Sequence, residues 1–118
     1  MNAINMAIDA NSWYESGYVK DMTIRNNKFI RCAEPVIKIA PWNRIANSSV
    51  YQHIRIENNA FILRNELIVQ ANSTDNLVVG GNTIYAEKKL NDKLSINTGD
   101  CKDPKVGQNK YIIQPKKL

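Results

Sequence analysis

A six-residue pattern recurs four times in this chain and constrains the fold more than any other feature. The pattern reads apolar-x-x-Asn-x-apolar, and its four asparagines are Asn27, Asn59, Asn82 and Asn109. They lie 32, 23 and 27 residues apart. Repeats of this length, with one short apolar segment per repeat, are typical of a solenoid in which each repeat stacks on its neighbours.

Apolar residues alternate directly upstream of three of these asparagines, as Ile54 and Ile56 do. Alternation with period two predicts a strand with one buried face. The asparagine then falls where the chain must turn, and it suits a turn because it tolerates left-handed backbone geometry. Since its amide both donates and accepts, four stacked copies are expected to form a structural Asn ladder. We therefore predict an all-β fold, a right-handed parallel β-helix of about four to five coils.

Further segments follow the same plan. The residue two positions after each asparagine is expected to stack in the core, and these residues are Phe29, Phe61, Ile84 and Tyr111. A second strand per repeat is predicted at residues 36–39, 67–70 and 94–96, whereas residues 41–49 and 97–105 are predicted to be loops. With 43% hydrophobic residues, the 118-residue chain can form one domain with its own core.

Charge and composition exclude several classes of function. The net charge is +5, but the lysines are scattered and form no basic stripe with interleaved aromatics, so no nucleic-acid partner is predicted. No apolar run is long enough to predict a membrane span, and the first residues do not predict a signal peptide. Its one His and two Cys lack metal-ligand spacing, and we predict neither a metal site nor a cofactor. His53, which shares a register position with Asp21 and Asn76, is predicted to be a surface turn residue.

The N-terminal region 1–18 contains a segment outside the strand pattern. Trp13, Tyr14 and Glu15 lie side by side there and are followed by Gly17. Two aromatic faces beside a carboxylate can contact a sugar, through its C–H groups and its hydroxyls. The same two aromatics can instead cap the open end of the solenoid. Both interpretations stay open, and the first makes these three residues substrate-binding candidates.

Two carboxylates fall at equivalent positions of neighbouring repeats. Glu34 and Glu66 each lie seven residues after their asparagine, so they are predicted to lie roughly 5 Å apart. That distance is close to the separation of the two carboxyl groups in retaining glycosidases. Both residues fall at turns, however, and Lys89 occupies the next equivalent position. A structural ion-pair ladder is therefore favoured over a catalytic pair. Arg25 and Glu57 are predicted to form a second surface pair.

Two stretches carry a family resemblance. The element Trp13-Tyr14-Glu15-Ser16-Gly17 and the following coil, residues 19–29, resemble the later β-helix coils of the bacterial exo-α-1,3-galactosidases of glycoside hydrolase family 110. The resemblance extends over most of residues 4–87. It implies an exported parent enzyme, periplasmic or extracellular, that removes terminal α-1,3-linked galactose with inversion and needs no metal or organic cofactor. It also implies catalytic aspartates in an adjacent-aspartate segment on earlier coils. This chain has no Asp-Asp pair.

Two functions therefore remain as hypotheses. In the first, residues 1–118 are a single β-helix domain from a longer galactosidase-like glycoside hydrolase, which contacts a galactose-containing glycan but contains no catalytic residue and is not active alone. In the second, the chain is a structural module that self-associates through its coil ends, because the cut end of a β-helix exposes unpaired strand edges.

Overall fold

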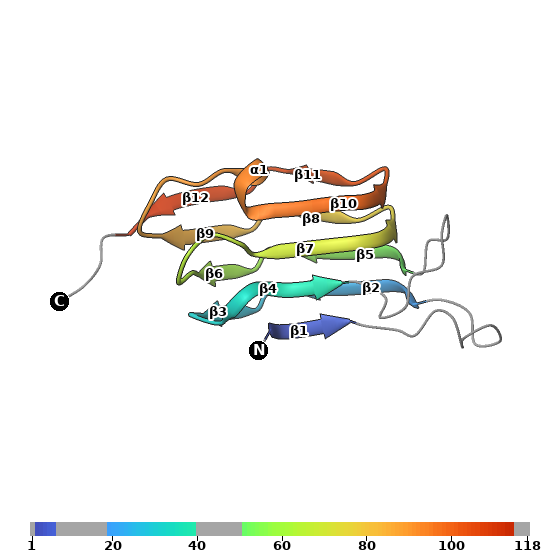
Figure 1. The fold of residues 1–118 in the computed structure, drawn as a ribbon, viewed down its shortest axis with the longest axis horizontal. Coiled ribbons are helices and arrows are strands. Elements are labelled where there is room, and N and C mark those ends of the chain that lie inside the picture. The colour runs from blue at the N-terminus through green and yellow to red at the C-terminus, as the bar shows by residue number, and fades with distance from the viewer. Residues whose placement is uncertain (1, 7–18, 40–50, 115–118) are drawn as a thin grey trace.

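The computed structural model describes residues 2–6, 19–39 and 51–114, which form four coils of three strands each (Figure 1). The first coil contains β1 (Asn2–Met6), β2 (Val19–Arg25) and β3 (Lys28–Ile30). The second contains β4 (Ala33–Ile39), β5 (Tyr51–Glu57) and β6 (Ala60–Ile62), and the third contains β7 (Val69–Asp75), β8 (Val78–Gly80) and β9 (Thr83–Ala86). A short helix, α1 (Asp92–Ser95), precedes β10 (Ile96–Lys102), β11 (Lys105–Gly107) and β12 (Lys110–Ile113) of the fourth.

Equivalent strands of successive coils pair in parallel and make three rows along the stack. The first row is β1–β4–β7–β10, the second is β2–β5–β8–β11, and the third is β3–β6–β9–β12. The first two rows join into one curled sheet because the end of β7 also pairs with the start of β5. The prediction of an all-β fold is confirmed, and the coiled, parallel arrangement is solenoid-like.

The core lies between the three rows and repeats from coil to coil. In the second row Ile24, Ile56 and Val79 are in register and buried. In the third row the residues two positions after each asparagine are in register, as predicted. Phe29 and Phe61 stack there with ring centroids 5.1 Å apart. Stacking of like apolar residues along each row removes them from water, which is the main stabilising term of such a fold.

Residues with a left-handed backbone conformation, at positive φ, recur at two positions in every coil. One set consists of Asp21, His53, Asn76 and Asp103, of which the first two lie inside β2 and β5 and the last two directly follow β7 and β10. The other set consists of Asn26, Asn58, Gly81 and Gln108, and each of these residues directly precedes an asparagine of the repeated pattern. The prediction that the patterned asparagine itself adopts the left-handed conformation is therefore wrong, since its predecessor does. The equivalence of Asp21, His53 and Asn76 is confirmed.

Two predicted segments differ from the structure in the fourth coil. Residues 94–96 were expected to be a strand, but Leu94 and Ser95 end helix α1, and β10 begins at Ile96. The helix forms because the side chain of Asn91 accepts a hydrogen bond from the backbone N–H of Leu94 at 2.9 Å, an N-cap contact. Residues 97–105 were expected to be a loop, but most of them belong to β10, whose pairing with β7 overrides their polar character.

Candidate functional site

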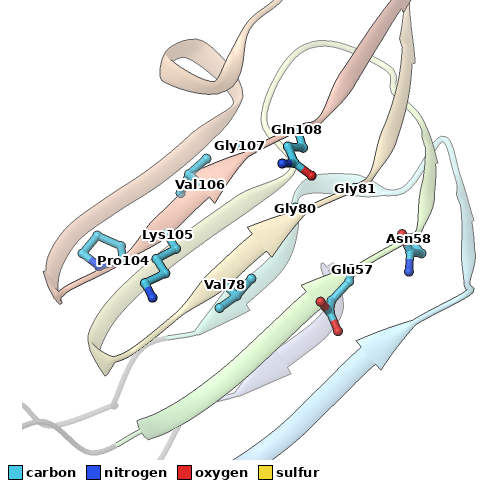
Figure 2. A pocket seen from close by; sticks show the side chains of 10 residues that line it. All are labelled: Glu57, Asn58, Val78, Gly80, Gly81, Pro104, Lys105, Val106, Gly107 and Gln108. Atoms are coloured by element: carbon cyan, nitrogen blue, oxygen red, sulfur yellow. The ribbon is translucent and has the colours of Figure 1, made fainter.

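A groove of about 590 Å³ crosses the outer face of the second row, and we call it the outer groove (Figure 2). It runs over β5, β8 and β11, with β8 in the middle. Because buried residues alternate with outward-facing ones along these strands, the same register that packs the core also presents the groove residues to solvent. The lining residues are Glu57, Asn58, Val78, Gly80, Gly81, Pro104, Lys105, Val106, Gly107 and Gln108.

Glycines make the hollow. Gly80 and Gly107 are in register with Glu57, so two coils lack a side chain where the preceding coil has one. A Cβ on Gly80 would lie 3.0 Å from the carbonyl oxygen of Gly107. Gly81 has a φ of +68°, and a Cβ there would lie 2.6 Å from Oδ1 of Asn58. Space and backbone conformation therefore both favour glycine at position 81.

Polar side chains stand on both sides of this glycine floor. Glu57 and Asn58 come from β5 and its following corner, whereas Lys105 and Gln108 come from β11 and its following corner (Figure 2). Together they offer a carboxylate, two amides and an ammonium group, while Val78 adds an apolar surface. Concave sites of this kind, with a few polar groups around an apolar floor, suit a small ligand rich in hydroxyl groups.

A second hollow of about 260 Å³ adjoins the outer groove and shares Val78 and Lys105 with it. Its other lining residues are His53, Arg55 and Asn76. Arg55 Nη1 lies 3.8 Å from Oε2 of Glu57, so the two hollows also meet through this loose ion pair. His53 is exposed at a corner, as the sequence predicted.

The four patterned asparagines lie next to one another on the corner between the second and third rows. The Nδ2 group of Asn59 donates to Oδ1 of Asn82 at 3.1 Å, and that of Asn82 donates to Oδ1 of Asn109 at 3.0 Å. Asn27 donates to Oδ1 of Asn59 in the same way at 3.2 Å. The same three Oδ1 atoms, of Asn59, Asn82 and Asn109, also accept the backbone N–H of the patterned asparagine one coil earlier, at 2.9–3.0 Å. We call these four residues the asparagine row.

The row ends on a carboxylate from helix α1. Asn109 has no patterned asparagine after it, and its Nδ2 group donates to Oδ1 of Asp92 at 3.0 Å. The Tyr111 hydroxyl donates to the same oxygen. Burial raises the pKa of Tyr111 well above its usual range, and the hydrogen bond and negative charge of Asp92 act in the same direction.

Glu34 and Glu66 lie on adjacent coils, as predicted, but Glu34 belongs to strand β4 rather than to a turn, and its carboxylate binds backbone groups of the next coil. Oε1 of Glu34 accepts the backbone N–H groups of Glu66 and Leu67, both at 2.8 Å, and its Oε2 accepts that of Asn65 at 2.7 Å. Glu34 therefore holds a turn of the next coil. Glu66 pairs with Lys88, whose Nζ lies 2.7 Å from Oε1 of Glu66. The prediction that Lys89 is the partner of Glu66 is therefore wrong.

The remaining sequence candidates have mixed outcomes. Trp13, Tyr14 and Glu15 lie outside the described residues. Arg25 and Glu57 are in register, but the ion pair that the structure gives Glu57 is with Arg55 on its own strand. Cys101, predicted in a loop, lies in β10, and its thiol donates to the carbonyl oxygen of Ala71 at 3.3 Å.

Sequence reasoning missed the outer groove. The signal that points to it is the Gly80–Gly81 pair, which replaces larger residues inside the repeated pattern. In the described ranges, no group of three or more His, Cys, Asp or Glu side chains could hold a metal ion. The described part of the chain also contains no helix with the length and apolar character that crossing a bilayer requires.

Comparison with known proteins gives a consistent result. No family model matches the chain. It is 38% identical over 117 residues to alpha-1,3-galactosidase A of Bacteroides thetaiotaomicron, which covers 96% of this chain. It is 45% identical over 92 residues, 71% of this chain, to alpha-1,3-galactosidase A of Bacteroides fragilis. Alpha-1,3-galactosidase B of Bacteroides thetaiotaomicron is 35% identical over 123 residues, which covers 92% of this chain.

These alignments cover only part of each relative. The matched region is 21%, 15% and 20% of the length of the three proteins, respectively. Within that span the comparisons confirm the resemblance that the sequence indicated, and this chain is related to a segment of the alpha-1,3-galactosidases.

Proposed function

We propose that this chain forms consecutive coils of a right-handed β-helix in a galactosidase-like glycoside hydrolase, and that its outer groove contacts the galactose-containing glycan. The observation that carries this proposal is the 38% identity to an alpha-1,3-galactosidase over 117 residues. Right-handed winding is expected because crossovers between parallel strands of one sheet are right-handed in nearly all known cases. The protein acts on glycans outside the cytoplasm, in the periplasm or the extracellular space.

The outer groove suits a sugar by its chemistry. Glu57 can accept hydrogen bonds from two neighbouring hydroxyls, and the amides of Asn58 and Gln108 can both donate and accept. The apolar surface of Val78 and the glycine floor can lie against the C–H face of a pyranose. Trp13, Tyr14 and Glu15 remain sequence-based candidates for further contacts with the same glycan.

The chain does not hydrolyse the glycosidic bond by itself. Hydrolysis needs an acid and a second carboxylate on either side of the bond. Of the ten residues that line the outer groove, one, Glu57, is a carboxylic acid. The Glu34 carboxylate accepts hydrogen bonds from three backbone N–H groups, which occupy both of its oxygens. The catalytic pair is therefore assigned to other coils of a longer protein.

A titration of the chain with an α-1,3-linked galactosyl disaccharide tests the binding proposal. Calorimetry should give a dissociation constant in the millimolar range, which corresponds to a binding free energy of about −4 kcal/mol. Asn58→Ala and Glu57→Gln should each weaken this binding, whereas Glu87→Gln, an exposed carboxylate outside the groove, should leave it unchanged. Equal binding by all four proteins, or no heat up to tens of millimolar, would contradict the proposal.

An activity assay tests the proposal that the chain alone does not hydrolyse the glycosidic bond. A chromogenic α-galactoside should show no turnover above background with the chain alone. Turnover that Glu57→Gln or Glu34→Gln abolishes would contradict the assignment of the catalytic pair to other coils.

Self-association through the coil ends is the second candidate function. The large apolar side chains that are exposed in the described ranges lie in the first coil, in the last coil, or in helix α1 at the end of the stack (Figure 1). They are Met22, Ile30, Leu94, Ile112 and Ile113. Because the described residues of the two inner coils expose none of this kind, the ends are the surfaces that a second copy would cover.

Light scattering at millimolar concentration tests this alternative. Self-association predicts dimers or larger assemblies. Ile30→Lys in the first coil and Ile113→Lys in the last coil should each reduce them, because both side chains are exposed at an end of the stack. A strictly monomeric mass would exclude self-association and leave the glycan-binding proposal untouched.

A further inference from the structure

The second hollow, next to the outer groove, is more cationic than that groove, which contains Glu57 beside its one lysine. It is lined by His53, Arg55, Asn76, Val78 and Lys105. Two of these side chains carry a permanent positive charge, one is a histidine, and one is an amide. None of the five is a carboxylic acid.

Strand register brings the two cations to the same small area. Arg55 pairs with Val78, and Val78 pairs with Lys105. The two cationic residues are therefore two strands apart, about 10 Å between their Cα atoms, with the short side chain of Val78 between them. Both side chains are long enough to reach over Val78 toward one point. An anion there would receive a charge-assisted hydrogen bond from each.

The surrounding charges set the strength of such a site. Glu57 lies 3.8 Å from Arg55, at the outer limit of an ion pair, and the Arg55 side chain keeps 56% of its surface exposed. Asp103 occupies the same corner position as Asn76, one coil further along. These two carboxylates flank the hollow without lining it. Their negative charges weaken the binding of an anion in the hollow. Because Arg55 forms only a long ion pair with Glu57, its guanidinium group can still bind such an anion.

We infer that the glycan bound in the outer groove carries an anionic substituent, a sulfate ester or a uronic acid carboxylate, which lies between Arg55 and Lys105. This inference rests on the proposed glycan-binding function and names its substrate class. The two hollows share Val78 and Lys105, so one saccharide can place its neutral ring over the glycine floor and its anionic group over Val78. Guanidinium and ammonium groups are the side chains that proteins use for sulfate and carboxylate.

Parallel titrations with three ligands test the inference. They are a sulfated galactose disaccharide, the same disaccharide without the sulfate, and sodium sulfate alone. The sulfated disaccharide should bind about tenfold more tightly than the neutral one. Sodium sulfate should bind more weakly than the sulfated disaccharide, because it lacks the ring contacts.

Variants connect the preference to the two cations. Arg55→Gln and Lys105→Gln should each remove most of the preference for the sulfated disaccharide, and Arg55→Lys should retain part of it. Lys110→Gln, an exposed cation on β12 outside both hollows, should keep it. Glu57→Gln should weaken binding of the neutral disaccharide while increasing the preference for the sulfated one, since it removes both a hydroxyl acceptor and a nearby negative charge.

The outcomes separate this inference from the function on which it rests. Equal affinity for the sulfated and neutral disaccharides would overturn the anionic substituent and leave the glycan-binding proposal intact. Sodium sulfate that binds as tightly as the sulfated disaccharide would overturn the assignment to a saccharide. If Lys110→Gln lowered the preference for the sulfated disaccharide as much as Arg55→Gln does, the preference would be a general effect of net charge. That result would also overturn the proposed site. No binding of any disaccharide would refute both proposals.

Discussion

The asparagine row and the outer face of the second row differ in how far their residues repeat from coil to coil. On the corner between the second and third rows, all four coils place the same residue, and the side chains of the asparagine row bond to one another. On the outer face of the second row, the in-register residues Thr23, Arg55, Val78 and Lys105 all differ. Asn59 and Asn82 in the row are at most 2% exposed, whereas Arg55 and Lys105 are exposed.

The difference follows from what each position must satisfy. A buried amide needs partners for every donor and acceptor, and a neighbouring amide at the strand spacing supplies them, so repetition stabilises the corner. An outward position has water as a partner, and its side chain can change from coil to coil at little cost in stability. The repeated residues thus hold the coils together, and the varied ones are available for a ligand.

The largest effect is expected in the asparagine row. Asn59→Ala and Asn82→Ala should each lower the free energy of unfolding by on the order of 1–3 kcal/mol, because each leaves buried donors and acceptors without partners. The two losses should be similar, since both side chains also donate to a carbonyl of the preceding coil, Ile24 at 2.9 Å and Ile56 at 3.0 Å. Chemical denaturation measures the loss.

A matched substitution on the outer side of the corner provides the control. Gln108→Ala removes an exposed side chain next to Asn109 and should change the free energy of unfolding by less than about 0.5 kcal/mol. A loss at Gln108 as large as that at Asn82 would mean that the two sides of the corner do not differ.

The glycine floor should give the next largest effect. Gly81→Ala places a side chain at a φ of +68° and a Cβ 2.6 Å from Oδ1 of Asn58, so it should destabilise the fold by at least about 1 kcal/mol. Gly107→Ala is the matched control, because a Cβ there meets nothing within 4 Å. Thermal unfolding of the two variants should differ by several degrees, and equal midpoints would contradict the role of Gly81.

The end of the asparagine row adds a dependence on pH. Since the pKa of Tyr111 is raised in the folded state, its contribution to stability is complete below the unfolded pKa of about 10 and is lost as the pH rises above it. The unfolding free energy of the wild type should therefore fall more steeply above pH 10 than that of Tyr111→Phe. Denaturation curves from pH 8 to pH 11 measure the difference, and parallel curves would argue against the buried hydroxyl.

The smallest effect is expected at the surface ion pair of Lys88 with Glu66, which forms in place of the predicted pair of Lys89 with Glu66. Lys88 and Glu66 are close, but 54% of the Lys88 side chain is exposed. Lys88→Met should cost less than about 1 kcal/mol, and the cost should shrink in 1 M salt. Lys89→Met should have no effect. A larger loss at Lys89 would restore the original ladder prediction.

Much of the fold could be predicted from the sequence. The spacing of the four asparagines gives the length of each repeat, and the alternation of apolar residues indicates where strands lie. The left-handed corner could not be placed from Asn26–Asn27 or Asn58–Asn59 alone, since either residue of each pair suits that conformation. Gly81, directly before Asn82, indicates the correct position, because glycine adopts a positive φ most readily.

The candidate site was less predictable for two physical reasons. Counting seven residues from each asparagine placed Glu34 near Glu66, but it could not show that the backbone N–H groups of residues 65–67 would take up the Glu34 carboxylate. The outer groove arises from side chains that are missing, at Gly80, Gly81 and Gly107, rather than from a chemical motif. The N-cap of helix α1, Asn91, is a residue type that favours helix starts, so this short helix has a signal in the sequence.

The contrast between the asparagine row and the outer groove can be measured residue by residue. Amide NMR spectra of the isotopically labelled chain, recorded during titration with the galactosyl disaccharide, should show shifts at Asn58, Gly80, Gly81, Gly107 and Gln108. The amides of Asn59 and Asn82, which are bonded inside the row, should stay close to their starting positions. Shifts concentrated in the row, or no shift at the glycines on saturation, would contradict the claim that the outer groove binds the glycan.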